Sequence, residues 1–99
     1  MARSRRSKST HNSKVRQVAR NYRGKGYDVE ADLTGLRQPG TIGGLRADLL
    51  VEKDGHQTLI EVETPDSTDS TRDLKQQKAF KDWSQRSPKR HYIRIITEE

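Results

Sequence analysis

The sequence contains no cysteine, which excludes a disulfide framework and a zinc site made of thiolates. Its three histidines, His11, His56 and His91, are scattered and form no recognisable set of metal ligands. No apolar run approaches the length of a membrane span, and the first residues lack the apolar segment of a signal peptide. We therefore expect a soluble, cytoplasmic protein with no membrane partner.

Large apolar side chains are also scarce. Leu, Ile, Val and Phe together account for 18 of the 99 residues, which predicts one domain with a small core. A small core leaves part of the stability to other contacts, such as a ligand or a second subunit. On these grounds we expect a homodimer.

Positive charge, by contrast, is abundant. Lys and Arg number 20 against 14 Asp and Glu, which gives a net charge of +6 and a pI near 9.9. Such an excess favours a polyanionic partner, with nucleic acid as the first candidate. An RNA-binding or ribosome-associated domain would carry the same charge.

Basic residues and serines fill residues 1–12, which offer nothing to bury. We expect a disordered basic arm there, which either follows phosphates or acts as a solubilising tail. A single domain is expected over residues 13–99.

Apolar periodicity indicates six elements in the order α, β, β, β, α, β. Val15, Val18, Ala19 and Tyr22 fall on one stripe of the first helix. The expected elements are helices over 12–23 and 71–85 and strands over 27–33, 46–53, 56–64 and 90–97, with a mobile glycine-rich loop over 34–45. The connection between the last two strands is long enough for a parallel crossover. The sequence therefore predicts an α/β (α+β) fold with a mixed four-stranded sheet flanked by helices.

An Asp-Gly pair at 54–55 between two alternating apolar runs predicts a β-hairpin with a type I′ turn. The register of this turn places Asp48 directly opposite Glu61, and directly opposed acids destabilise a sheet. A solvated acidic face is one interpretation. In a basic chain, however, we favour a divalent cation such as Mg²⁺ between the two carboxylates.

The same register places Glu63 opposite Arg46, so Glu63 is either a third acid of the site or one half of a cross-strand salt bridge. In the second helix, Lys75 or Lys78 is expected to face the acids. The core-facing stripe of that helix is expected to contain Leu74, Gln77, Phe80 and Trp83.

Basic side chains on the first helix provide a candidate nucleic-acid surface, although a merely solvated cationic face has the same pattern. The candidate phosphate contacts are Arg16, Arg20, Arg23, Arg46 and Lys78.

Several short motifs resemble the PD-(D/E)XK nuclease superfamily, especially small members such as the archaeal Holliday-junction resolvases and the VRR-type nucleases. The resemblance spans residues 14–97, and the order of the elements contributes as much to it as the individual residues. The motifs are Lys25-Gly26-Tyr27, Arg46-Ala47-Asp48-Leu49-Leu50, Leu59-Ile60-Glu61-Val62-Glu63, and Gln76 with Phe80.

The resemblance implies a restriction-endonuclease-like core and a Mg²⁺- or Mn²⁺-dependent endonuclease that hydrolyses phosphodiester bonds. By this resemblance DNA is the expected substrate class, ahead of RNA, and branched or junction DNA is a candidate. The metal ligands would be Asp48, Glu61 and the carbonyl of Val62. The implied catalytic set is Asp48, Glu61, Glu63, Lys75 and Gln76.

The chain departs from the family pattern in three places. Glu63 stands where the family usually has Lys, and Ala47 stands where it usually has Pro. Many relatives carry an acid in the first helix, where this chain has none and Gln17 is the nearest polar substitute. These departures leave open an alternative, a nuclease fold that binds nucleic acid without cleaving it.

Overall fold

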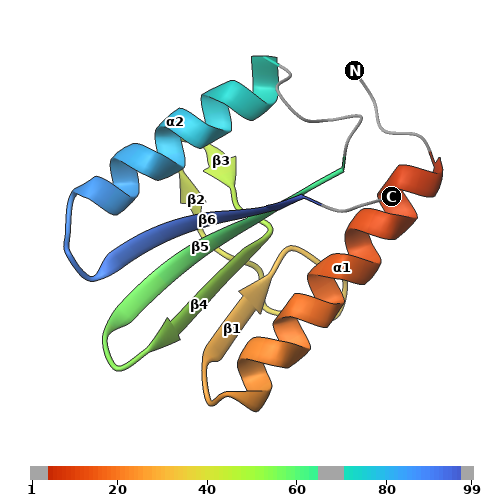
Figure 1. Ribbon diagram of the computed structural model, residues 1–99, viewed down its shortest axis with the longest axis horizontal. Coiled ribbons are helices and arrows are strands. Elements are labelled where there is room, and N and C mark those ends of the chain that lie inside the picture. Colours follow the sequence, from red (N-terminus) through yellow and green to blue (C-terminus); the bar gives the residue numbers. More distant parts are fainter. Residues whose placement is uncertain (1–4, 65–70, 97–99) are drawn as a thin grey trace.

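The centre of the structure is a four-stranded sheet with the strand order β1-β4-β5-β6 (Figure 1). The computed structural model describes residues 5–64 and 71–96. The elements in chain order are α1 (Arg5–Gly24), β1 (Asp28–Ala31), β2 (Thr41–Ile42), β3 (Leu45–Arg46), β4 (Leu49–Lys53), β5 (His56–Glu63), α2 (Thr71–Gln85) and β6 (Arg90–Ile96). Strands β1, β4 and β5 pair antiparallel, whereas β5 and β6 pair parallel across α2. The predicted fold class, a mixed sheet flanked by helices, is therefore confirmed.

The hairpin between β4 and β5 has the predicted turn and register. Asp54 and Gly55 both have positive φ, 54° and 81°, as a type I′ turn requires. The ladder runs from Lys53 opposite His56 to Leu49 opposite Ile60. It stops there, because the next amide of β5, the Val62 N–H, donates to the Asp48 side chain and not to a backbone carbonyl. On the other edge of β4, the Asp32 N–H donates to the carbonyl of Asp48 at 2.9 Å.

The expected cross-strand pair between Arg46 and Glu63 is accordingly absent from this ladder, and that prediction was wrong. Arg46 lies in β3 opposite Thr41, and its Nη1 donates to Oε1 of Gln38 at 2.6 Å. The register argument failed because it extended the strand beyond the point where the chain bends away.

We expect Gly55→Ala to lower the free energy of unfolding by about 1–2 kcal/mol, the cost of holding an L-residue in the left-handed region. A β carbon at Gly55 would meet only Lys89 Nζ, at 3.9 Å, so the cost is conformational and not steric. Urea unfolding measures it. Gly40→Ala is the matched control, since a β carbon there meets nothing within 4 Å and φ is not positive. Equal effects of the two substitutions would contradict the turn assignment.

Helix α1 begins at Arg5, seven residues earlier than the expected start. Residues 5–12 contain no glycine or proline to stop a helix, so the backbone there is helical where a disordered arm was expected. Residues 1–4 of the expected arm lie outside the described residues. The longer helix extends the buried stripe by one turn toward the N-terminus. His11, four residues before Val15, is the buried residue of this added turn.

The glycine-rich segment between β1 and β4 contains a small hairpin that the periodicity did not reveal. Strands β2 and β3 are joined by Gly43 and Gly44, which have φ values of 60° and 79°. Two-residue strands are too short to show alternation, but the Gly-Gly pair between Ile42 and Leu45 is a hairpin signal that could have been used.

The sheet is covered differently on its two faces. On one face, α1 packs on side chains that alternate along the strands, including Leu49, Val51, Ile60 and Val62. On the other face, α2 and the β2–β3 hairpin cover Leu59 and Leu50 around the fully buried Phe80. None of the helices in the described ranges is both long enough and apolar enough to cross a bilayer.

Helix α2 buries less of its stripe than expected. Phe80 is buried and Gln77 and Trp83 are half-buried, but Leu74 is 55% exposed. Leu74 therefore contributes little to the core, although it lies on the predicted stripe.

Candidate active site

The candidate site lies at the C-terminal end of β5, where the first halves of α1 and α2 approach the same end of the sheet (Figure 1). Polar side chains are buried here in an otherwise apolar interior. Glu61 is 4% exposed, Glu63 is 3% exposed, and His11 of α1 is 7% exposed. Burial of ionisable groups is costly unless they are paired or bind an ion, so their convergence at one place suggests a functional site.

Asp48 is held in place by main-chain geometry. The residue precedes β4, and its Oδ2 accepts a hydrogen bond from the Val62 N–H at 2.8 Å. The last backbone pair of the hairpin is Leu49 with Ile60. Beyond that pair, the Asp48 side chain accepts the hydrogen bond that a backbone carbonyl would accept in a regular ladder. Asp48 is thereby fixed beside the end of β5, as the sequence predicted, although by a different contact from the expected strand pairing.

His11 completes the surroundings of Asp48 from the first helix. Its Nε2 lies 3.1 Å from Oδ2 of Asp48, and its Nδ1 lies 3.2 Å from Oδ1 of Asn12. Both ring nitrogens thus face oxygen acceptors, an arrangement that suits an imidazolium with two N–H donors. This contact joins α1 to the start of β4.

The pKa of Asp48 is lowered from its ordinary value of 3.8. Burial alone raises this pKa, but the hydrogen bond and the charge of His11 lower it, and the hydrogen bonds from the Val62 N–H and the Glu61 side chain lower it further. Asp48 therefore stays ionised inside the protein.

The Glu61 side chain is among the groups that lower the pKa of Asp48, so the two carboxyl groups lie close together. Two carboxyl groups at that separation share a proton or hold a cation, because like charges in a buried site repel. An all-oxygen donor pair suits Mg²⁺ or Mn²⁺, which prefer oxygen ligands. Among the residues that the structure describes, no group of three or more His, Cys, Asp and Glu is arranged to hold a metal, so the backbone and water would supply the remaining ligands.

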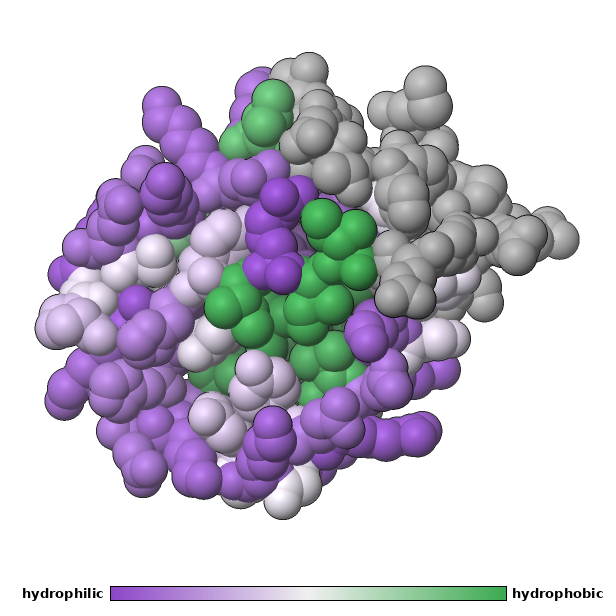
Figure 2. Space-filling model, in the orientation of Figure 1, coloured by the Kyte–Doolittle hydropathy of each residue, from purple (hydrophilic) through white to green (hydrophobic). Residues whose placement is uncertain are grey.

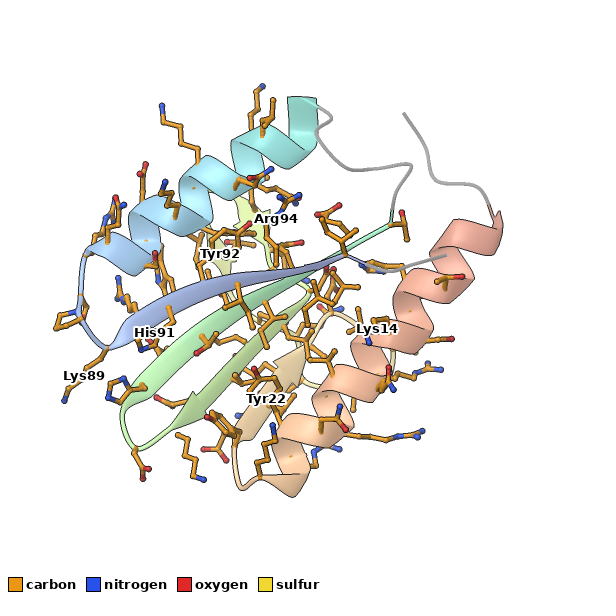
Figure 3. All side chains as sticks on the ribbon, in the orientation of Figure 1. Lys14, Tyr22, Lys89, His91, Tyr92 and Arg94 are labelled. Carbon is orange, nitrogen blue, oxygen red and sulfur yellow. The ribbon has the colours of Figure 1, made fainter. Side chains whose placement is uncertain are left out.

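Arg94 is a neighbour of the site that sequence reasoning missed. Strand β6 pairs in parallel with β5, and Arg94 is the register partner of Glu61. Figure 3 shows Arg94 and Tyr92 near one another on β6, on the side covered by α2. Neighbouring strands lie about 4.8 Å apart, so the backbone of Arg94 is next to that of the buried Glu61.

His11 was missed for a related reason. The family pattern suggested an acid in the first helix, with Gln17 as the nearest substitute. Gln17 is exposed, and its Oε1 accepts a hydrogen bond from Lys14 Nζ (3.2 Å). The usable signal was the position of His11 four residues before Val15, on the buried stripe.

The structure brings the other expected catalytic residues together only in part. Glu63 is buried two residues beyond Glu61 on the same side of β5, and Gln76 is half-buried on α2. Lys75 and Lys78 are exposed on α2, so neither is enclosed with the buried acids.

The expected nucleic-acid contacts on α1 are available to a partner. Arg16, Arg20 and Arg23 are exposed, and Arg46 and Lys78 are exposed on β3 and α2. Their contact with nucleic acid remains a prediction.

Comparison with known proteins assigns the chain to a family. The family model described as REase_AHJR-like matches residues 3–89, which is most of the chain and includes Asp48, Glu61 and His11. No curated protein and no solved structure matches. A restriction-endonuclease-like family suggests a nuclease, and its members usually use divalent metals. The chain belongs to the REase_AHJR-like family of restriction-endonuclease-like proteins.

Proposed function

We propose that this protein is a divalent-metal-dependent endonuclease that hydrolyses phosphodiester bonds in DNA, with branched or four-way-junction DNA as the candidate substrate. The observation that carries this proposal is the buried contact between the Asp48 and Glu61 carboxyl groups at the end of β5. Family membership supports the same reaction class.

Asp48 and Glu61, with the carbonyl of Val62, would hold Mg²⁺ or Mn²⁺. When bound, the ion polarises the scissile phosphate and lowers the pKa of an attacking water. The Val62 N–H fixes the orientation of Asp48, and His11 keeps Asp48 ionised, so this carboxylate is ready to bind before the substrate arrives.

Arg94 takes the role of the missing family lysine in this proposal. As the register partner of Glu61, it supplies positive charge on the side of the acids opposite to His11. A cation there balances the buried carboxylates and stabilises the negative charge that grows on the phosphate during hydrolysis.

The exposed arginines of α1 would hold the DNA backbone. Arg16, Arg20 and Arg23 recur along one helix that begins beside the site, so a strand that reaches Asp48 can follow them. Such contacts are not specific to sequence, and the affinity they provide falls steeply with salt.

A cleavage assay tests the proposal. Linear, nicked and four-way-junction DNA are incubated with the protein in Mg²⁺, in Mn²⁺ or in EDTA. Cleavage that needs the metal and is faster on the junction supports both the reaction and the substrate. Absence of metal-dependent cleavage on every substrate would refute the enzyme assignment.

One observation favours a second candidate, a nuclease fold that binds nucleic acid without cleaving it. Glu63, an acid, occupies the position of the family's usual lysine, and it is buried. This candidate predicts salt-sensitive DNA binding that Mn²⁺ does not change. Mn²⁺ that raises the melting temperature of the native protein, but not of Asp48→Ala, would argue against it.

A homodimer is part of the proposal. Figure 2 shows an apolar patch over the sheet between α1 and α2, and Ile93 on the edge strand β6 is 38% exposed. Within the described residues, β6 pairs with β5 alone, so its other edge offers backbone groups to a strand of a second copy.

We expect Ile93→Lys to weaken the dimer by tenfold or more, because a charge at the centre of an apolar contact adds roughly 1.4 kcal/mol or more to its cost. Analytical ultracentrifugation over a concentration series measures it. Leu74→Lys, at an exposed apolar position on α2, is the control and should leave the dimer intact. A native protein that is monomeric at all concentrations would contradict the dimer.

A further inference from the structure

A pair of histidines lies at the end of the sheet opposite the candidate active site. His56 is the first residue of β5 and His91 is the second residue of β6. His56 Nδ1 and His91 Nε2 are 3.1 Å apart, and the two rings are inclined by only 14°. Figure 3 shows His91 beside Lys89 near the start of β6, away from Arg94. Glu61 lies five residues further along β5, roughly 16 Å away at the rise of a strand.

The backbone beneath this pair is well fixed. His56 pairs with Lys53 across the Asp54-Gly55 turn, and the Gln57 N–H donates to the carbonyl of Lys89 at 2.8 Å. His91 is the register partner of Thr58, two residues after His56, so the two imidazoles project from the same face of the sheet. Both side chains are exposed, which leaves their rings free to rotate on a rigid base.

We propose that His56 and His91 form a two-histidine binding site for a borderline transition-metal ion, with Zn²⁺ or Cu²⁺ as the ion class. As they stand, one ring nitrogen donates its proton to the lone pair of the other. A metal ion replaces that proton and accepts both lone pairs. Two nitrogens bound to one Zn²⁺ at about 2.0–2.1 Å and a tetrahedral angle lie roughly 3.3 Å apart, close to the 3.1 Å observed. Ring rotation with little backbone movement is therefore sufficient.

The surroundings indicate which ions this site selects. Lys53 pairs with His56 in the ladder, and Lys89 Nζ approaches the turn at Gly55. The ligands of this site are therefore imidazole nitrogens and not carboxylate oxygens. Imidazole favours Cu²⁺, Ni²⁺ and Zn²⁺ over Mg²⁺ and Ca²⁺. Water would fill the remaining positions, since the described residues include no cluster of three metal-binding side chains.

Isothermal titration of the untagged protein with ZnCl₂ or CuCl₂ tests the site, with Mg²⁺ in large excess to occupy the carboxylates. Loss of an outer-shell partner alone weakens metal binding about 10–100-fold. We therefore expect His56→Gln and His91→Gln each to weaken binding at least tenfold without changing the melting temperature of the metal-free protein. In the native protein, the electron paramagnetic resonance spectrum of bound Cu²⁺ should show two nitrogen ligands.

The third histidine provides the matched control. His11→Gln should leave the titration unchanged, because His11 is at the other end of the sheet. Binding that survives in the His56→Gln, His91→Gln double variant would overturn the proposal and reduce the pair to a hydrogen bond. Binding lost only in His11→Gln would assign the ion to the site at Asp48 instead. The result is independent of whether the protein cleaves DNA.

Discussion

Glu61→Gln should reduce metal-dependent DNA cleavage by about 10³-fold or more. The substitution keeps the shape of a side chain that is 4% exposed, so the fold is retained while one of the two converging carboxylates is lost. Metal ions contribute several kcal/mol to such reactions, and each 1.4 kcal/mol is a factor of ten in rate. Single-turnover cleavage measures the rate, and calorimetric titration with Mn²⁺ measures the ion's affinity; both should fall together.

Glu52→Gln is the matched control for this substitution. It removes the same charge from the neighbouring strand β4, but Glu52 is exposed and far along the hairpin toward the turn. Cleavage by this variant should stay within about twofold of the native rate, since exposed substitutions away from a site change little. Unchanged cleavage by Glu61→Gln, or an equal loss in both variants, would remove Glu61 from the mechanism.

The sequence indicated that Asp48 and Glu61 lie close together because local rules place both near the same end of one hairpin. The Asp-Gly turn requires positive φ at residues 54 and 55, and this requirement sets the register of the whole hairpin. Extrapolation of that register was valid as far as Leu49. Beyond it, the side chain of Asp48 replaced the backbone in the ladder, and the predicted pairing of Arg46 with Glu63 was lost.

His11 and Arg94 could not be found by local rules. His11 is 37 positions from Asp48 in the sequence, and Arg94 is 33 positions from Glu61. His11 reaches Asp48 because the first half of α1 lies at the same end of the sheet. Arg94 lies beside Glu61 because β6 pairs in parallel with β5. Periodicity gives the face of an element that is buried, but not which distant side chain that face meets.

In the helices, the buried faces were predicted better than the ends. Val15, Val18 and Ala19 marked the buried face of α1 correctly, whereas the start of α1 was placed too late because residues 5–12 carry little apolar pattern. Leu74 is the opposite case: it is an apolar residue at a position that the periodicity marked as buried, yet it is 55% exposed in the fold.

His11→Gln should destabilise the protein by roughly 1.5–3 kcal/mol near neutral pH, the range for a hydrogen bond to a charged group. His11 Nε2 lies 3.1 Å from Asp48 Oδ2, with side-chain exposures of 9% and 16%, so solvent screens the contact little. Because outer-shell partners of metal ligands contribute about 10–100-fold to affinity or activity, cleavage should fall within that range. Lys14→Gln removes a positive charge from the same helix, where the Lys14 Nζ donates only to the exposed Gln17, and as the control it should change stability by less than about 0.5 kcal/mol.

The pH dependence of stability separates the charge of this pair from its packing. The folded-state pKa of Asp48 is lowered below 3.8, so the stabilisation from its ionised form is complete above that value. It is lost as the pH falls through the folded-state pKa, because the unfolded chain then binds more protons than the native one does. In His11→Gln the pKa of Asp48 is expected to rise, so the difference in stability between the native protein and the variant should shrink as the pH falls through the acid range. Urea unfolding across the acid range measures this convergence. A difference that stays constant with pH would mean that His11 stabilises α1 by packing alone, and that the Asp48 carboxylate is kept ionised by the Val62 N–H and Glu61.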